Sequence, residues 1–192
     1  TKRLADSEIR IDIPVLLVIV KNDFTINSKV AINLYEQGRF GRRSEMLVYA
    51  PLEKDGRCIK DLRPGDAAAV PRRPTLIGSC FVHHHAGSQY LIADYSHMAL
   101  TLAPDDEHYG LEGDYRHCTH YFLDQQMQAR CKQTPSDSDK LCFGERKAIG
   151  SQSYPGFGQH CSVVRRLTSN PQFDQLTGLL ERFIGDYIDE KD

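Results

Sequence analysis

Hydrophobic and polar residues alternate from Ile9 and then give way to an apolar run that ends at Val20, a pattern typical of a partly and then fully buried β-strand. Residues 46–50 have a similar β-rich composition, and turn residues bound both segments. Between them, residues 28–35 fit either a strand or a short helix ending at Gly38, and we favour the strand. The first half of the chain is therefore predicted to be rich in strands.

A β-hairpin is predicted over residues 80–97, with a tight connection at residues 86–88. With a two-residue loop, Cys80 and His97 lie on the same face as diagonal neighbours, roughly 7–8 Å apart, so their side chains can meet. A three-residue loop instead pairs Cys80 with Asp94 and turns His97 to the other face. The register of this hairpin therefore decides whether the thiol and the imidazole can act together.

The second half of the chain has the apolar spacing of helices. One helix is predicted over residues 114–130, and a clearer one opens behind an Asn170 cap, with Pro171 at its first position. Its apolar positions recur at helical spacing and are Phe173, Leu176, Leu179, Leu180, Phe183, Ile184 and Tyr187. We expect this amphipathic helix to pack on the sheet.

Composition narrows the classes of protein that fit. A chain of 192 residues, 40% hydrophobic and 26% charged, predicts a single domain over residues 1–192. The formal net charge of −2 and a pI near 6.4 disfavour binding to nucleic acid. The longest apolar run, residues 13–20, is eight residues long and too short to span a bilayer.

Six cysteines would allow three disulfides, but a chain of this size does not need them to fold, and we expect most of the thiols to be reduced and buried. Cys131 and Cys142 flank a polar, proline-containing loop. A bridge between them and two unpaired thiols are equally compatible with the sequence. This point stays open.

The histidines raise the question of a metal site. His83, His84 and His85 are consecutive, so on a strand they point to alternating faces and cannot all reach one ion. His117 and His120 could supply two ligands from a helix, and Cys118 lies between them in the sequence. No C-x-x-C or H-E-x-x-H spacing supports such a site. We therefore predict neither a metal nor a cofactor.

Cys80 and His97 together offer the chemistry of covalent catalysis. A thiolate attacks carbonyl carbon, and a nearby imidazole lowers the thiol pKa and transfers its proton. A lone cysteine at the start of a strand is more often a buried small hydrophobe. Gly78 and Ser79 change this balance, because small residues before the thiol allow a substrate to approach and leave main-chain N–H groups available to an oxyanion.

The segment Thr75-Leu76-Ile77-Gly78-Ser79-Cys80, with Pro64-Gly65-Asp66 before it and His97-Met98-Ala99-Leu100 after it, resembles the chemotaxis glutamine deamidase CheD. It is also similar in plan to the catalytic domains of the cytotoxic necrotizing factor toxins and the Burkholderia lethal factor. The chain departs from CheD at the histidine triplet, in its longer N-terminal portion and in the helix from Pro171. These departures favour a divergent relative, such as a bacterial effector or toxin domain.

The resemblance implies an α+β fold in which a central twisted β-sandwich or mixed sheet is flanked by helices. It also implies hydrolysis of a glutamine side chain on another protein. Cys80 would be the nucleophile and His97 the base, while the N–H of Ser79 or Cys80 would stabilise the oxyanion. Thr75 would contact the substrate, and either Asp94 or a main-chain carbonyl would orient His97.

The expected partner is a protein with an accessible glutamine, and the sequence does not say whether it is a GTPase or a receptor. We expect a soluble protein that acts in the cytosol, either that of the bacterium or that of a host cell after secretion. Two alternatives remain. One is another Cys-His enzyme, a transglutaminase or cysteine protease, and the other is a binding module with a vestigial site.

Overall fold

The computed structural model describes the chain in segments, at residues 10–21, 23, 25–51, 74–78, 81–83, 89–92, 94–113, 129, 141–144 and 163–188. These residues belong to two compact units, and each unit is described by itself. Unit 1 takes its described residues from Thr1–Ala50, Ile59–Gly78 and Asp174–Asp192, and unit 2 from Pro51–Cys58 and Ser79–Phe173.

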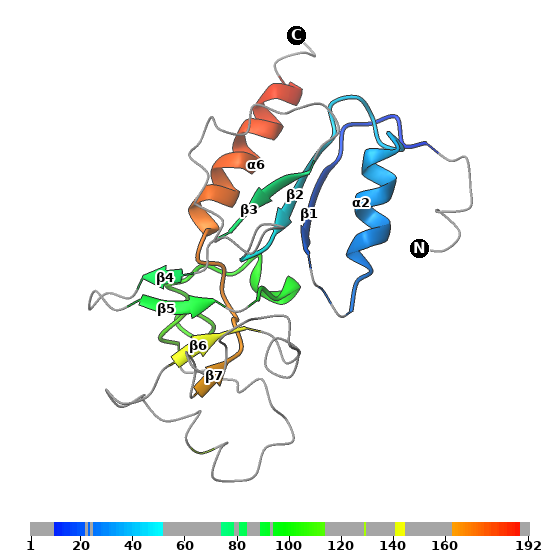
Figure 1. The fold of residues 1–192 in the computed structure, drawn as a ribbon. Helices are drawn as coiled ribbons and strands as arrows, with labels where there is room; N and C mark the ends of the chain where they lie inside the picture. The colour runs from blue at the N-terminus through cyan, green and yellow to red at the C-terminus, as the bar shows by residue number, and fades with distance from the viewer. Residues whose placement is uncertain are drawn as a thin grey trace. The chain divides into compact units, whose positions relative to one another are not determined.

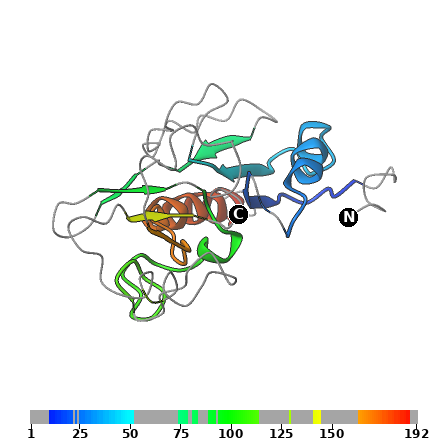
Figure 2. The ribbon, with the colours of Figure 1, turned by 60° about the horizontal axis from the view of Figure 1, so that its bottom comes forward.

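Unit 1 is built on a parallel sheet of three strands in the order β1 (Leu16–Val20), β2 (Glu45–Tyr49) and β3 (Thr75–Ile77) (Figure 1, Figure 2). Leu16 pairs with Glu45, and Leu47 pairs with Thr75. The strand predicted from Ile9 to Val20 is confirmed only over Leu16–Val20, and the one predicted over residues 46–50 is confirmed with a displacement of one residue. Parallel neighbours need a crossover connection, and helix α2 (Ser28–Glu36) supplies it between β1 and β2.

The preference for a strand over residues 28–35 is therefore wrong, and the helical alternative that ends near Gly38 is correct. The side chain of Asn27 accepts a hydrogen bond from the N–H of Val30 and caps the helix start. Gly38 follows the helix with a φ of 69°, a left-handed conformation that glycine adopts at little cost. Two local signals thus bound the helix.

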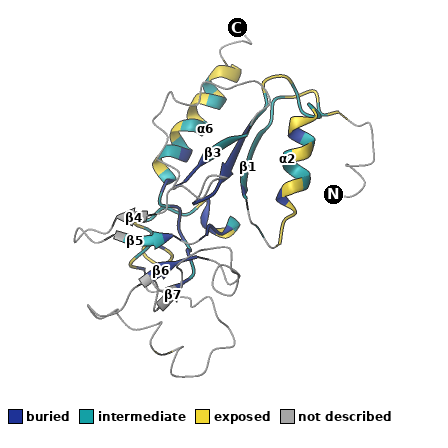
Figure 3. Cartoon of the chain, in the orientation of Figure 1, coloured by how far each residue is buried: buried dark blue, intermediate teal, exposed yellow. Residues whose placement is uncertain are grey.

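α2 and α6 (Phe173–Ile188) lie against opposite faces of this sheet (Figure 1). Tyr35 of α2 packs with Met46 and Val48 in the main cluster of unit 1. Side chains alternate along β2, so Glu45 points to the other face, where Arg182 of α6 forms an ion pair with it at 2.6 Å. Both helices are mostly half-buried or exposed (Figure 3), with Leu176 the buried residue of α6 and Ser28 and Tyr35 those of α2.

The C-terminal helix predicted from Asn170 and Pro171 is confirmed, although it begins two residues after Pro171. The side chain of Asn170 accepts the N–H of Gln172 at 3.0 Å, and its carbonyl accepts the N–H of Phe173 at 3.1 Å. These bonds form a turn ahead of the helix, so Asn170 organises the approach to the helix rather than its first residue.

Unit 2 contains a mixed sheet in the order β4 (Phe81–His83), β5 (Gln89–Ile92), β6 (Leu141–Phe143) and β7 (Val163–Arg165). β4 and β5 are antiparallel, whereas β5, β6 and β7 are mutually parallel. The described chain is thus a mixed α/β protein with small sheets and flanking helices. The helix predicted over residues 114–130 lies almost wholly outside the described residues.

In the part of the chain that is described, no helix has the length and apolar character required to cross a bilayer. The prediction that the chain forms one domain stays a prediction, since the two units are separate clusters of contacts within it.

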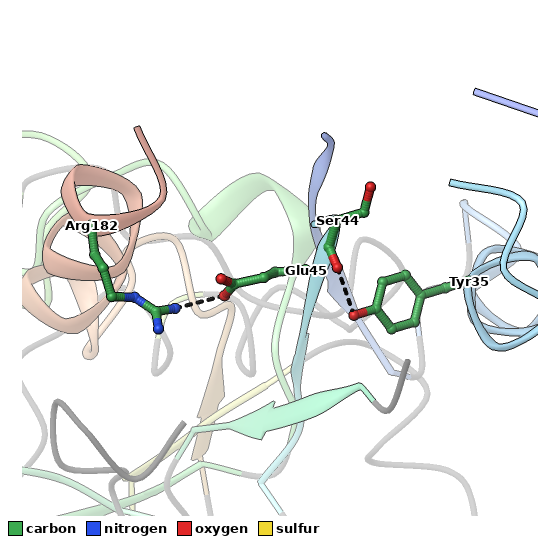
Figure 4. A network of polar contacts seen from close by, with 4 residues as sticks. All are labelled: Tyr35, Ser44, Glu45 and Arg182. Atoms are coloured by element: carbon green, nitrogen blue, oxygen red, sulfur yellow. Dashed lines mark hydrogen bonds and ion pairs between the residues drawn. The ribbon is translucent and has the colours of Figure 1, made fainter. Parts of the chain in front are cut away.

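Tyr35→Phe is expected to destabilise unit 1. The Tyr35 hydroxyl donates to the Ser44 carbonyl at 3.0 Å (Figure 4), and the variant leaves this carbonyl without that donor. We expect the free energy of unfolding at neutral pH to fall by about 1 kcal/mol, as measured by urea denaturation. An unchanged urea midpoint would contradict the contribution of this bond.

The same variant should change how stability depends on pH. Burial, and next the nearby Glu45 carboxylate, raise the pKa of Tyr35 above its ordinary value of 10.0. As pH rises past that value the unfolded chain loses this proton first, so the contribution of Tyr35 is intact below pH 10 and is lost as pH passes the folded pKa. Urea titrations above pH 9.5 should show a shallower alkaline decline in Tyr35→Phe than in the parent, and equal slopes would contradict it.

Candidate functional site

The five candidate site residues fall on different parts of the structure. Ser79 and Cys80 lie outside the described residues, so their pairing with other groups stays a prediction. Thr75 begins β3 in unit 1. Asp94 and His97 belong to unit 2, as does the segment of chain that contains Cys80.

The predicted register of the hairpin is wrong. Phe81 pairs with Leu91 and His83 with Gln89, a register displaced by two or three residues from those that the two loop lengths predict. The described residues of β4 pair with Gln89, Tyr90 and Leu91, and not with Asp94 or a later residue. β5 ends at Ile92, and the diagonal contact proposed across the two strands cannot form there.

The strand ends before His97 because the chain offers its backbone other partners. The buried carboxylate of Asp94 accepts the N–H of Tyr95 at 2.9 Å, a local bond that competes with strand pairing. His97 then opens a 3₁₀ turn, η1 (His97–Ala99). The expected role of Asp94 in orienting His97 stays a prediction, but its carboxylate is already engaged with the backbone that leads to the histidine.

Ser96 caps the turn that carries His97. Its side chain accepts the N–H of Met98 at 3.3 Å, and its carbonyl accepts the N–H of Ala99 at 3.0 Å. Within the turn Ala99 is fully buried, Met98 is exposed and His97 is half-buried. The imidazole therefore belongs to a surface turn and not to the core, which is the condition that a proton-transfer group must meet.

A buried hydrogen-bond network joins this segment to the chain just before α6. The Tyr95 hydroxyl donates to the side-chain carbonyl of Gln172 at 2.6 Å. The side-chain amide of Asn170 donates to the carbonyl of Leu100 at 3.0 Å, and the Asn170 N–H donates to that of Leu102 at 2.7 Å. The turn with His97 is thus held on both sides.

The sequence interpretation missed most of this network. It identified Asn170 as a helix cap and gave no role to Gln172, because 77 residues separate Gln172 from Tyr95. The only local sign of a further role was a polar residue, Gln172, close to the predicted cap Asn170.

Gly78 ends β3 with a φ of 134°, a conformation that side chains other than glycine rarely adopt. The residue is buried, and it directly precedes Ser79 and Cys80 in the chain. β3 is a parallel strand, and open α/β sheets place their ligand sites beyond the carboxyl ends of such strands. The candidate nucleophile therefore follows a backbone conformation reserved for glycine at the end of a sheet where chemistry commonly occurs.

For Cys142 the alternative of an unpaired thiol is wrong, while the expectation that most of the six cysteines are reduced stays a prediction. Cys142 is fully buried on β6, between β5 and β7, and it is disulfide-bonded. The partner sulfur lies outside the described residues, as do all five other cysteines. Whether the bridge closes the loop to Cys131 stays open.

The described residues contain no group of three metal-ligating side chains that could hold an ion. His117, Cys118 and His120, the residues of the disfavoured zinc alternative, lie outside those residues and are not tested by this finding.

Comparison with protein-family models finds no match for this chain, and comparison with curated proteins and with solved structures finds none either. The resemblance to CheD and the toxin deamidases is therefore carried by the motif residues alone. Family membership is not shown.

Cys142→Ala should reveal the contribution of the disulfide to stability. We expect the free energy of unfolding to fall by roughly 2–5 kcal/mol in urea without a reductant, because the unfolded chain gains the freedom that the cross-link removed. With a reductant that cleaves the bridge, the parent should move toward the variant. Equal stability of the two proteins without a reductant would contradict a bridge at this position.

Proposed function

We propose that this chain is a cysteine-dependent amidohydrolase that deamidates glutamine side chains on a partner protein, with Cys80 as nucleophile and His97 as general base. The observation that carries the proposal is Gly78. Its φ of 134° is a backbone conformation that favours glycine, and it lies directly after β3, two residues before the thiol. A nucleophile that closely follows the end of a strand can be presented to a substrate from outside the sheet.

The position of His97 also supports the proposal, because it suits a general base. It is half-buried on a capped turn, so solvent and a substrate can reach a ring that the backbone nevertheless restrains. General bases need a position within hydrogen-bond reach of the proton they remove. The observed strand register removes the strand-to-strand contact that was predicted between Cys80 and His97. In this proposal the two side chains meet through the chain segments outside β4 and β5.

The proposed reaction has two steps. The Cys80 thiol gives its proton to His97 and its sulfur attacks the carbonyl carbon of the glutamine side chain, while the N–H of Ser79 or Cys80 stabilises the oxyanion. His97 returns the proton to the departing ammonia and leaves a thioester. Water, deprotonated by His97, then cleaves the thioester to give glutamate and restores the thiol.

Thr75 and Asp94 take supporting roles in this proposal. Thr75 is assigned a contact with the substrate, and Asp94 or a main-chain carbonyl orients His97. The proposal includes the finer fold assignment, a CheD-like or toxin-like sandwich, and a target protein that is either a GTPase or a receptor. It also includes action in a bacterial or host cytosol as an effector or toxin.

The disulfide at Cys142 favours a second candidate, a non-catalytic binding module whose cysteines are all paired. Disulfides persist mainly in oxidising compartments, whereas the proposed enzyme requires a free thiol at Cys80. The two candidates therefore differ in whether the sulfur of Cys80 is a free thiol or part of a disulfide.

Counting thiols separates them. Six cysteines, two of them used by the Cys142 bridge, leave four, and further bridges remove thiols in pairs. We expect a denatured, unreduced single chain to bind a thiol dye at two or four cysteines, with Cys80 among them in the peptide map. A reduced sample supplies the full count as the control. No labelled cysteine, or a map in which Cys80 is bridged, would reject the enzyme and favour the binding module.

Cys80→Ser should abolish ammonia release from a glutamine-bearing partner protein, while the free energy of unfolding changes by no more than about 1 kcal/mol. His97→Ala should lower the rate by roughly 10²- to 10⁴-fold, the usual contribution of a general base. His108→Ala, which changes an exposed histidine of the same unit, should retain activity. Full activity in Cys80→Ser would end the proposal, and a loss of only a few-fold in His97→Ala would move the base to His83, His84 or His85.

A further inference from the structure

The segment that carries His97 has little structure of its own. η1 is a single 3₁₀ turn of three residues, and such turns have weaker hydrogen-bond geometry than an α-helix. Ser96 contributes two local bonds, to the N–H groups of Met98 and Ala99, at 3.3 and 3.0 Å. Since both donors follow His97, these bonds define the turn but do not tie it to the rest of unit 2.

Two residues outside the segment supply that attachment, and we call Asn170 and Gln172 the anchor residues. Gln172 accepts the Tyr95 hydroxyl at 2.6 Å, two positions before His97. Asn170 binds the carbonyls of Leu100 and Leu102 at 3.0 and 2.7 Å, three and five positions after it. The histidine therefore sits between two attachments to one short stretch of chain.

Burial makes these attachments stiff. Tyr95, Asn170 and Gln172 are 1%, 0% and 6% exposed, so water has little access to compete for their hydrogen bonds. A buried donor or acceptor that loses its partner is costly, which opposes any movement that would break one of the bonds. The backbone on either side of His97 is therefore held by buried hydrogen bonds, and moving it requires that one of them break.

The side chain of Asn170 is specific for this task. Its amide nitrogen donates to Leu100 while its oxygen accepts the N–H of Gln172 at 3.0 Å, so both ends of the carboxamide are used. Aspartate has the same shape and retains the acceptor, but it has no donor for the Leu100 carbonyl. Only an amide of this length satisfies both neighbours.

We propose that Asn170 and Gln172 are positioning residues for His97, fixing the imidazole for proton transfer by holding the backbone on both sides of its turn. This inference rests on the proposed function, because positioning His97 matters for catalysis only if His97 is the general base. Its structural content, restraint of His97, can be tested without any substrate. Misplacement of a catalytic group by about 1 Å can cost a rate factor of roughly 10², so such restraint has a measurable effect on turnover.

Two variants of the whole chain test the proposal. Asn170→Asp removes the donor to Leu100, and Tyr95→Phe removes the bond to Gln172 with almost no change of shape. Thr168→Val is the matched control, because the Thr168 hydroxyl donates to the Tyr109 carbonyl at 2.8 Å and no described bond of its side chain reaches the 95–102 segment. All three changes remove one side-chain hydrogen bond from the same unit.

The main readout is the ring signal of His97 in an NMR spectrum of histidine-labelled protein, together with hydrogen exchange at the Ala99 amide. In both test variants we expect the ring signal to shift and broaden and the Ala99 amide to exchange about tenfold faster, as for a locally opened segment. With a partner protein that the parent deamidates, kcat should fall roughly 10- to 100-fold with little change in KM. Thr168→Val should match the parent in each measurement.

The outcomes separate this inference from the function on which it rests. An unchanged His97 signal and unchanged Ala99 exchange in folded Tyr95→Phe would overturn the inference, even if Asn170→Asp failed to fold. Disturbed His97 signals together with a parent protein that releases no ammonia would reject the deamidase and still support the restraint. Disturbed signals with an undiminished kcat would overturn the positioning role.

Discussion

A carboxamide with no exposure to solvent is the constraint on which unit 2 depends. Asn170 uses its backbone N–H, its carbonyl and both ends of its side chain in hydrogen bonds, and these reach a segment some 70 residues earlier in the chain. Buried polar groups must find such partners, so one residue determines where two distant stretches lie. Its neighbour Pro171 then directs the chain toward α6.

The parts of the fold that depend on local patterns were predictable, and α2 shows how close the alternatives were. Val30 and Ile32 are β-branched and favoured a strand, but Ala31, Ile32 and Tyr35 share one helical face and pack on the sheet. The deciding factor was the parallel pairing of β1 with β2, which requires a crossover. No residue within 28–36 indicates that pairing, but the flanking Asn27 and Gly38 carry start and stop signals that favour the helix.

The candidate site was predictable as a set of residue types but not as a geometry. Gly78 and Ser79 suggested room for a substrate before Cys80, whereas the positive φ of Gly78 was not predicted. The hairpin register failed because the choice of loop length depended on which of several small residues made the turn. The state of Cys142 was left open for a different reason, since the spacing of cysteines does not reveal which of them are close in space.

The order of the units along the chain has a consequence for biosynthesis. Unit 1 draws its strands from residues before Gly78 and its second helix layer from α6, while most of unit 2 lies between them. On a ribosome, the strands of unit 1 emerge early and must wait, with one face uncovered, until the residues of unit 2 have been made. An exposed apolar sheet face favours aggregation, so α6, the last element to be made, is also the one that covers this face.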